Sequence, residues 1–219
     1  MSGTRGRFVT FEGGEGAGKS TQVHRLAQKL RAAGVDVVTT REPGGSPTAE
    51  VIRGFLLSGR AKKLGTVGEA YLFAAARIDH VAETIEPALA RGAFVLCDRF
   101  ADSTRVYQGS AGGLDVSVID HLERVAVGDC VPDLTIVIDV PVNIGMLRLG
   151  LRKGEADRFE ADAIAVHEAR RRGFLAVAKA NPERCVVVDG SSDIDVVEAE
   201  VARIVAERFG LDLPSGAER

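Results

Sequence analysis

The loop GGEGAGKS, from Gly13 to Ser20, constrains the fold of this 219-residue chain more than any other feature of its sequence. It lies directly after a short apolar run and directly before a segment with helical periodicity. In a strand–loop–helix unit, Gly, four residues and then Gly-Lys-Ser let successive backbone N–H groups converge on a phosphate. The lysine of such a loop reaches the outer phosphates and the hydroxyl ligates Mg²⁺, so we predict these roles for Lys19 and Ser20. Glu15 is unexpected, because it places a carboxylate in a loop that attracts anions.

Five short apolar runs predict the strands of a mainly parallel sheet. They cover residues 8–11, 35–38, 94–97, 134–140 and 185–188. Continuous apolar runs suit strands that are covered on both faces. Segments with helical periodicity lie between them, including residues 23–30 and 197–205. This alternation predicts a single α/β domain over residues 1–219, a five-stranded parallel sheet flanked by helices, with a frayed tail over residues 210–219.

The charge balance argues against nucleic-acid and membrane partners. The net charge is −3 and the basic residues are dispersed along the chain. No apolar run approaches the ~20 residues that a membrane-spanning helix needs. The three cysteines, Cys97, Cys130 and Cys185, are far apart and form no Cys-x-x-Cys pair, which argues against disulfides and zinc and for a reducing compartment. We therefore expect a cytoplasmic protein.

Aspartates end three of the predicted strands, at the edge of a parallel sheet where ligands bind. Asp98, Asp139 and Asp189 each offer the acidic partner of Mg²⁺ that a phosphate loop needs, or else make a turn or cap a helix. The turn or cap is the favoured interpretation for Asp139 and Asp189. Asp98 differs because Arg99 follows at once and places a guanidinium beside the carboxylate. We therefore predict Ser20 and Asp98 as the metal ligands.

The residues that accompany the loop favour a phosphotransferase. The Asn/Thr-Lys-x-Asp motif with which GTPases read their base is absent, and no strand-end aspartate is followed by the glutamate of motor ATPases. Residues 148–160 carry Arg148, Arg152 and Arg158 in a glycine-containing segment. This composition favours a lid that closes over the reaction and neutralises charge on the transferred phosphoryl group. The alternative is a solvated helix face with ordinary charges.

Several separated motifs, in the right order, resemble those of a known family, the thymidylate (dTMP) kinases. They are FEGGEGAGKST at residues 11–21, TREPGG at 40–45, FAAAR at 73–77, DRF at 98–100, DSTRVYQG at 102–109 and PDL at 132–134. The resemblance covers nearly the whole chain, from about residue 8 to residue 206. Each motif alone is weak, whereas the set is highly specific.

The resemblance implies a P-loop kinase that transfers the γ-phosphoryl group of ATP to dTMP with Mg²⁺, giving dTDP and ADP for dTTP synthesis. It also implies a homodimer formed through helices. In this family the P-loop carboxylate reaches the deoxyribose of the acceptor, or acts through Mg²⁺-bound water and an arginine, here Glu15 and Arg99. The chain resembles the bacterial branch in which the lid supplies the arginine that the loop lacks. Arg152 and Arg158 are therefore candidate transition-state clamps, and Arg148 resembles the residue that stacks on adenine.

Two sets of residues follow for the donor side and for catalysis. The expected ATP-binding residues are Gly13, Gly14, Glu15, Gly16, Ala17, Gly18, Lys19, Ser20, Thr21 and Arg148. The expected catalytic residues are Lys19, Arg99, Arg152, Arg158 and Glu15.

The acceptor site combines base chemistry with the resemblance. Phe73 can stack on thymine, and Arg77, four residues later on the same helix face, can donate to O4. Ordinary core packing is the alternative for Phe73. Thr104 and Gln108, one helical turn apart, can hold the N3 edge. The resemblance implies that Tyr107 packs beneath the sugar where a ribose 2′-hydroxyl would lie, which selects deoxyribose, and that arginines cage the monophosphate. The full expected dTMP-binding set is Glu15, Arg41, Pro43, Arg53, Phe73, Arg77, Arg99, Ser103, Thr104, Tyr107 and Gln108.

Two other functions stay open at the level of sequence. One is a P-loop kinase that acts on a different nucleotide or deoxynucleoside, which a panel of acceptors would separate. The other is a non-catalytic P-loop protein that binds ATP without turnover. The intact Lys19, Ser20, Asp98 and Arg99, together with the arginines of residues 148–160, argue against the second.

Overall fold

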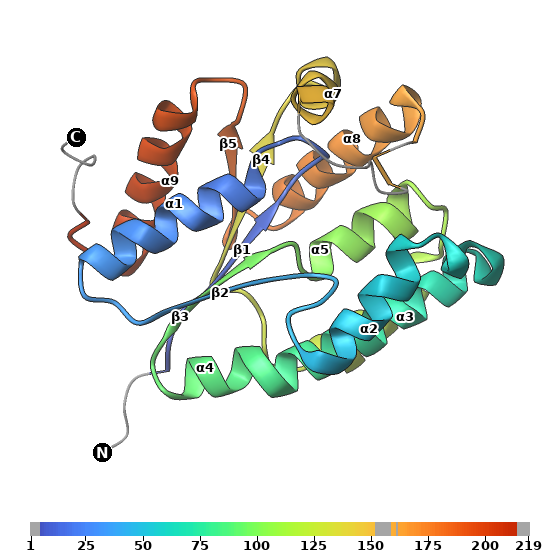
Figure 1. The fold of residues 1–219 in the computed structure, drawn as a ribbon, viewed down its shortest axis with the longest axis horizontal. Coiled ribbons are helices and arrows are strands. Elements are labelled where there is room, and N and C mark those ends of the chain that lie inside the picture. Colours follow the sequence, from blue (N-terminus) through green and yellow to red (C-terminus); the bar gives the residue numbers. More distant parts are fainter. Residues whose placement is uncertain (1–4, 152–158, 161, 214–219) are drawn as a thin grey trace.

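The predicted five-stranded parallel sheet is confirmed. The computed structural model describes residues 5–151, 159–160 and 162–213. The strands are β1 (Phe8–Glu12), β2 (Val37–Arg41), β3 (Phe94–Asp98), β4 (Leu134–Asp139) and β5 (Cys185–Asp189). They are ordered β2-β3-β1-β4-β5 and every neighbouring pair is parallel (Figure 1). Parallel neighbours need crossovers, and helical segments supply them.

Four of the five predicted strands begin at the expected residue, and β2 does not. The apolar run predicted a strand over residues 35–38, whereas β2 begins at Val37 and continues through Thr39 and Thr40 to Arg41. The reason is its position at the edge of the sheet, where it pairs with β3 alone and its side chains are partly exposed. An edge strand does not need the continuous apolar run of a central one.

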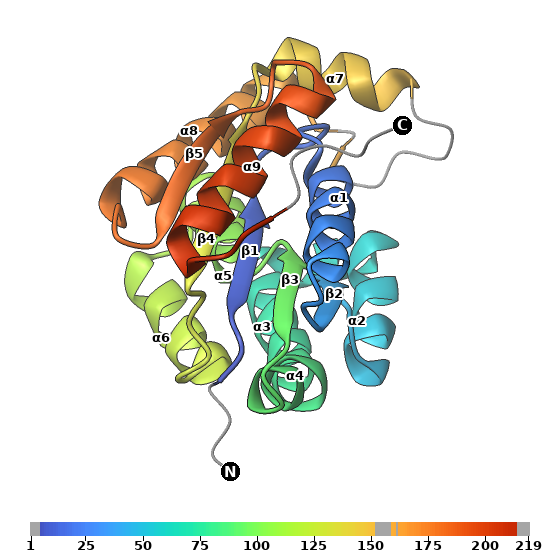
Figure 2. The ribbon, with the colours of Figure 1, turned by 90° about the vertical axis from the view of Figure 1, so that its left-hand side faces the viewer.

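Helices cover both faces of the sheet. Their bounds are α1 (Lys19–Ala32), α2 (Pro47–Leu57), α3 (Gly65–His80), α4 (Glu86–Ala90), α5 (Ala101–Thr104), α6 (Val116–Val127), α7 (Val142–Leu151), α8 (Ile164–Ala180) and α9 (Ile194–Phe209). Turns of π-helix at Val81–Ile85 and Arg105–Ser110 extend α3 and α5. Figure 2 shows α1 and α9 on one face, where Leu26, Leu30 and Val201 pack against strand residues such as Phe11. Phe8, Val95 and Cys97 pack on the opposite face with the segment around α4.

Cys97, Cys130 and Cys185 are buried and form no disulfide. Within the described residues, no helix is long and apolar enough to cross a bilayer. In the segment expected to be a frayed tail, Leu211 and Leu213 pack against the core that α1 and α9 cover. The last residues, 214–219, lie outside the described part.

Candidate active site

The loop between β1 and α1 has the backbone that a phosphate cradle needs. Gly13, Gly16 and Gly18 have positive φ angles of 139°, 69° and 93°. A Cβ on Gly16 would lie 2.1 Å from the carbonyl oxygen of Gly145, so only glycine fits there. Lys19 Nζ donates to the carbonyl oxygens of Gly13 at 3.2 Å and Gly14 at 2.8 Å. The lysine is thus held over the loop, and the N-terminus of α1 adds a positive dipole end.

Ser20 and Asp98 lie together at the carboxyl end of the sheet. The Ser20 hydroxyl donates directly to Asp98 Oδ2, although the two residues are far apart in sequence. Two oxygen ligands suit Mg²⁺, which prefers one or two protein oxygens and completes its shell with phosphates and water. Within the described ranges, no group of three or more His, Cys, Asp or Glu side chains forms a metal cage. The donor set therefore fits Mg²⁺ bound with a nucleotide.

The negative charge of Glu15 is compensated by neighbouring cations, and a tyrosine donates a hydrogen bond to its carboxylate. Its carboxylate accepts from Arg99 Nη2 at 3.0 Å and from the Tyr107 hydroxyl. Burial alone would raise the pKa of Glu15, but the charges of Arg99 and Lys19 outweigh it and lower the pKa to about 2. The carboxylate is therefore ionised at neutral pH.

Arg99 is the centre of this side of the site. It has a positive φ of 70°, which is uncommon for a residue with a side chain. Its Nη1 donates to the Gly13 carbonyl oxygen at 3.0 Å and to Ser103 Oγ at 3.2 Å. Its guanidinium carbon lies 5.1 Å from the centre of the Tyr107 ring. Arg99 thus connects the phosphate loop, α5 and the expected sugar wall.

Glu12 is a site residue that sequence reasoning missed. Its carboxylate is fully buried and accepts from the backbone N–H groups of Phe100 and Ser103 at 2.7 and 3.2 Å, and from Ser103 Oγ at 2.6 Å. Burial, and next the charge of Asp102, raise the pKa of Glu12 to about 7. The carboxyl holds the backbone that positions Arg99. A glutamate that ends an otherwise apolar strand was the signal that could have found it.

One cavity brings together every residue of the expected acceptor set. Its lining contains Glu15, Arg41, Pro43, Arg53, Phe73, Arg77, Arg99, Ser103, Thr104, Tyr107 and Gln108, with Glu42 and Phe159 among further members. Phe73 is half-buried and faces this cavity, which favours the stacking role over core packing. Phe159, which the sequence did not indicate, packs 5.5 Å from the Tyr107 ring and 6.3 Å from the Phe73 ring. Arg170 of α8 holds it, because Nη1 donates to the Phe159 carbonyl oxygen at 3.0 Å.

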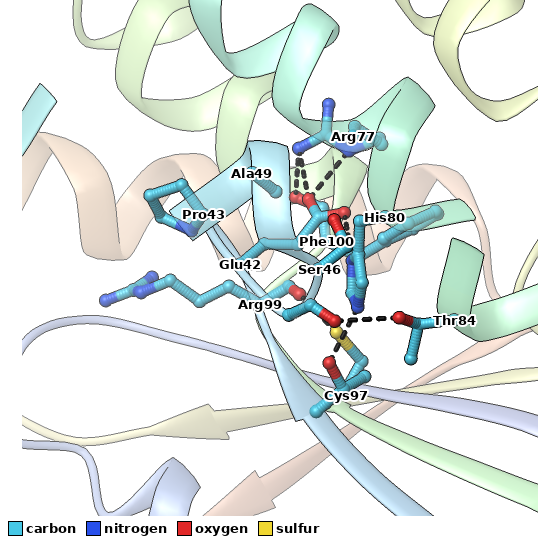
Figure 3. A network of polar contacts seen from close by, with 12 residues as sticks. Glu42, Pro43, Ser46, Ala49, Arg77, His80, Thr84, Cys97, Arg99 and Phe100 are labelled. Carbon is cyan, nitrogen blue, oxygen red and sulfur yellow. Dashed lines mark hydrogen bonds and ion pairs between the residues drawn. The ribbon is translucent and has the colours of Figure 1, made fainter. Parts of the chain in front are cut away.

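Arg77 has partners that the sequence did not predict. The side chain is 3% exposed and forms an ion pair with Glu42, with Nε 2.7 Å from Oε2. Its Nη2 donates to the Phe100 carbonyl oxygen at 3.1 Å and to Thr104 Oγ1 at 3.2 Å. Figure 3 shows the guanidinium above the loop that carries Glu42 and Pro43. Thr104 and Arg77 therefore meet on the same wall of the cavity.

The arginines expected to hold the monophosphate also line this cavity. Arg53 Nη1 donates to the Pro43 carbonyl oxygen at 2.6 Å, and Arg41 Nη2 lies 3.0 Å from Glu50 Oε1. Arg41 and Arg53 line the cavity together with Arg99, so three guanidinium groups border one space.

A second cavity adjoins the first along the phosphate loop. Residues from Glu15 to Thr21 line it together with Asp98, Arg99, Arg148 and Gly190. Gly13 and Gly14 lie outside this lining and supply the carbonyl oxygens that bind Lys19. Arg148 Nη1 donates to the Gly190 carbonyl oxygen at 2.8 Å, which fixes the arginine at the wall of this cavity. The predicted lid arginines, Arg152 and Arg158, lie outside the described residues.

The other two strand-end aspartates have structural roles. Asp139 forms a bidentate ion pair with Arg171 of α8, at 2.7 and 2.8 Å. Asp189 accepts from the backbone N–H and the hydroxyl of Ser191, and so makes a turn. The interpretation of Asp189 as a turn residue is confirmed, and Asp139 ties α8 to the sheet.

A family model for thymidylate kinase matches residues 11–201 of the chain. A thymidylate kinase of Nitrobacter winogradskyi is 54% identical over 206 residues, which cover 93% of this chain and 90% of that protein. A thymidylate kinase of Caulobacter vibrioides is 52% identical over 208 residues, which cover 95% of this chain and 100% of that protein. The crystal structure of thymidylate kinase from Ehrlichia chaffeensis superposes with a TM-score of 0.74 at 36% identity, covering 92% of this chain and 99% of that one.

Proposed function

This chain belongs to the thymidylate kinase family, and from that premise we propose how its residues perform the family's reaction. As a nucleoside monophosphate kinase, it transfers the γ-phosphoryl group of ATP to dTMP and produces dTDP and ADP. The observation that carries the assignment of roles is the pair of adjoining cavities, which share Glu15, Ser20, Asp98 and Arg99. We assign the acceptor to the cavity of Arg77 and the donor to the cavity of Lys19.

Catalysis in this site is positioning and charge neutralisation. The attacking group is an oxygen of the acceptor monophosphate, which is ionised near pH 7, so no general base is needed. Arg41, Arg53 and Arg99 hold that monophosphate, and Lys19 binds the outer phosphates of ATP. The shared residues hold the two nucleotides in line. The transfer step is then effectively unimolecular, which removes most of the entropic cost of bringing the two nucleotides together.

The metal of this reaction is proposed to be Mg²⁺, held by Ser20 and Asp98. When bound, it neutralises phosphate charge in the transferring group. The direct contact between the Ser20 hydroxyl and the Asp98 carboxylate supports the assignment, because it shows that the two oxygens are close enough to bind the same ion.

We propose that different residues of the cavity bind the base and the sugar of the acceptor. Arg77 donates to thymine O4, Phe73 stacks on the ring, and Thr104 and Gln108 hold the N3 edge. Tyr107 excludes a ribose 2′-hydroxyl, which would lose its water without finding a partner, at a cost of about 1–3 kcal/mol. The hydrogen bond from Tyr107 to Glu15 supports this role, since it fixes the ring beside the loop that faces the sugar.

The donor nucleotide is proposed to lie against Arg148, with adenine stacked on the guanidinium. Its contact with the Gly190 carbonyl oxygen supports the role because it holds the guanidinium in the donor cavity. Arg152 and Arg158 are proposed to neutralise the charge that develops on the transferred group.

We also propose that the chain is one catalytic domain that works as a cytoplasmic homodimer. Large apolar side chains on neighbouring helices support the dimer: Val51, Val67, Tyr71 and Val125 are each at least half exposed. Such a set suits a helix-mediated interface. Light scattering should give twice the chain mass of 23.2 kDa, and a monomer at micromolar concentration would contradict the proposal.

Replacing Arg77 tests the assignment of the acceptor cavity. Arg77→Ala should lower kcat/KM for dTMP by about 10- to 100-fold, because an unpaired O4 in a largely dry site costs about 1–3 kcal/mol. The dissociation constant of ATP, measured by calorimetry, should stay within about twofold of the wild type. Equal losses for ATP and dTMP would instead give Arg77 a structural role.

A further inference from the structure

The loop that follows β2 is held to α3 by side chains of that helix and of the π-helical turn after it. Asp79 accepts from Ser46 Oγ at 2.6 Å and from the Ala49 backbone N–H at 3.2 Å. Thr84 Oγ1 donates to the Gly45 carbonyl oxygen at 2.7 Å. These contacts fasten the loop, but none of them reaches the guanidinium of Arg77.

Glu42 makes a different kind of contact from the same loop. Its side chain is nearly fully buried, and its two carboxylate oxygens bind two different residues of α3. Oε2 accepts from Arg77 Nε at 2.7 Å, and Oε1 lies 3.0 Å from His80 Nδ1. The other ring nitrogen of His80 lies 2.6 Å from Thr40 Oγ1. The carboxylate is therefore fixed at both oxygens, and Figure 3 shows it between the arginine and the histidine.

These contacts fix the orientation of the Arg77 guanidinium. Glu42 binds Nε and lies 2.7 Å from Nη2, and Nη2 also donates to Phe100 and Thr104. The guanidinium carbon lies 5.2 Å from the centre of the Phe100 ring. Two of the three guanidinium nitrogens are thus held from the side of the protein. In the described part of the chain, Nη1 is the nitrogen that no hydrogen bond holds, so it can donate to a ligand in the cavity.

We propose that Glu42, supported by His80, is a positioning residue that sets the base specificity of the acceptor site by fixing Arg77. The inference rests on the proposed function, in which Arg77 reads O4 of thymine. At the same position cytosine carries an amino group, so two donors would face each other. A fixed guanidinium cannot turn away from that clash, whereas a mobile one can. Specificity therefore depends on the carboxylate behind the arginine as well as on the arginine.

The test measures the ratio of kcat/KM for dTMP to kcat/KM for dCMP. Glu42→Gln keeps the size of the side chain but removes the negative charge that pairs with Arg77, and it replaces one of the two acceptor oxygens with an NH₂ donor. We expect the ratio to fall about tenfold or more, with dTMP use impaired and dCMP use raised or unchanged. Asp79→Asn is the matched control: it loosens the same loop without touching Arg77, so it should lower the melting temperature and leave the ratio within about twofold.

A double variant separates positioning from a merely structural role. If Glu42 acts through Arg77, adding Glu42→Gln to Arg77→Met should change the ratio by less than about twofold. If the two substitutions changed the ratio independently, so that the double variant showed the product of the two single effects, the inference would be overturned. A single Glu42→Gln variant with the wild-type ratio would overturn it as well. Should Glu42→Gln fail to fold, Glu42→Asp makes the same test, because the shorter carboxylate cannot reach both partners. A wild-type enzyme with no preference for dTMP would instead contradict the proposed function.

Discussion

At the scale of single residues, two glutamates three positions apart have opposite electrostatics. Glu12 and Glu15 belong to the same strand-and-loop segment, yet the pKa of Glu12 is raised to about 7 and that of Glu15 is lowered to about 2. The difference lies in their neighbours. Glu12 is enclosed by the core and close to Asp102, whereas Glu15 faces Arg99 and Lys19. The carboxylate in the phosphate loop is therefore one part of a cluster of charges that also holds two cations.

This balance predicts a pH dependence of stability. The folded-state pKa of Glu15 is below its ordinary value of 4.5, so its stabilising effect is complete above about pH 4.5 and is lost as the pH falls toward 2. The gap in unfolding free energy between the wild type and Glu15→Gln should be constant from pH 7 to 5. It should then shrink by roughly 2–3 kcal/mol in total as the pH falls toward 2.

Urea-induced unfolding of both proteins at pH 7, 5, 4 and 3 would measure that gap. The exposed Glu83→Gln controls for the general loss of a carboxyl group. A gap that does not narrow below pH 5 would show that Glu15 is not held ionised by Arg99 and Lys19.

Sequence reasoning at this scale found residues that line the cavity but missed the residues that hold them in place. Phe73 and Arg77 followed from helical spacing and base chemistry taken together with the resemblance to the thymidylate kinases. Glu42 was visible only as part of a motif, because its ion pair with Arg77 joins residues 35 positions apart. Such partners are set by how the loop after β2 meets α3, and a local pattern carries no information on that contact.

At the scale of elements, prediction succeeded where a local signal fixes the backbone. The glycines of the phosphate loop, the helix that begins at Lys19 and the apolar central strands are each specified within a few residues. It failed at β2, whose polar residues pair with one neighbour, and at Phe159, whose place in the acceptor cavity depends on Arg170 of α8. Both depend on packing between elements that are distant in sequence.

The arginine-bearing segment of residues 148–160 supports a prediction at the same scale. If Arg152 and Arg158 serve the transition state, the double variant Arg152→Ala, Arg158→Ala should lower kcat by ~10³-fold or more, with small changes in KM for either substrate. The double variant is the cleaner choice because in a single variant the remaining arginine would still supply a positive charge. Steady-state rates at saturating ATP and dTMP provide the measurement. A near-normal kcat would show that Arg152 and Arg158 do not neutralise charge in the transition state. It would also leave unexplained why the phosphate loop carries Glu15 and no arginine.

At the scale of the whole molecule, the order of the strands brings the separate motifs to one place. With the order β2-β3-β1-β4-β5, the carboxyl ends of β1, β2 and β3 are neighbours. The loop after β1 and Asp98-Arg99 at the end of β3 therefore border both cavities, and the Glu-Pro loop after β2 borders the cavity of Arg77. The alternation of strands and helices predicted the fold class, but the meeting of these loops follows from the order of the strands in the sheet, which the sequence pattern does not specify.

This chain transfers the γ-phosphoryl group of ATP to dTMP and selects dTMP over other nucleoside monophosphates. A coupled assay of ADP release tests both points most directly, with dTMP, dUMP, dCMP, dAMP, dGMP and UMP offered in turn at a fixed concentration of ATP and Mg²⁺. We predict the highest kcat/KM for dTMP, a value lower by about tenfold or more for dCMP and the purine nucleotides, and poor use of the ribonucleotide UMP. Faster turnover of any other acceptor, or binding of ATP with no ADP release from any of the six, would contradict phosphoryl transfer to dTMP as the reaction of this site.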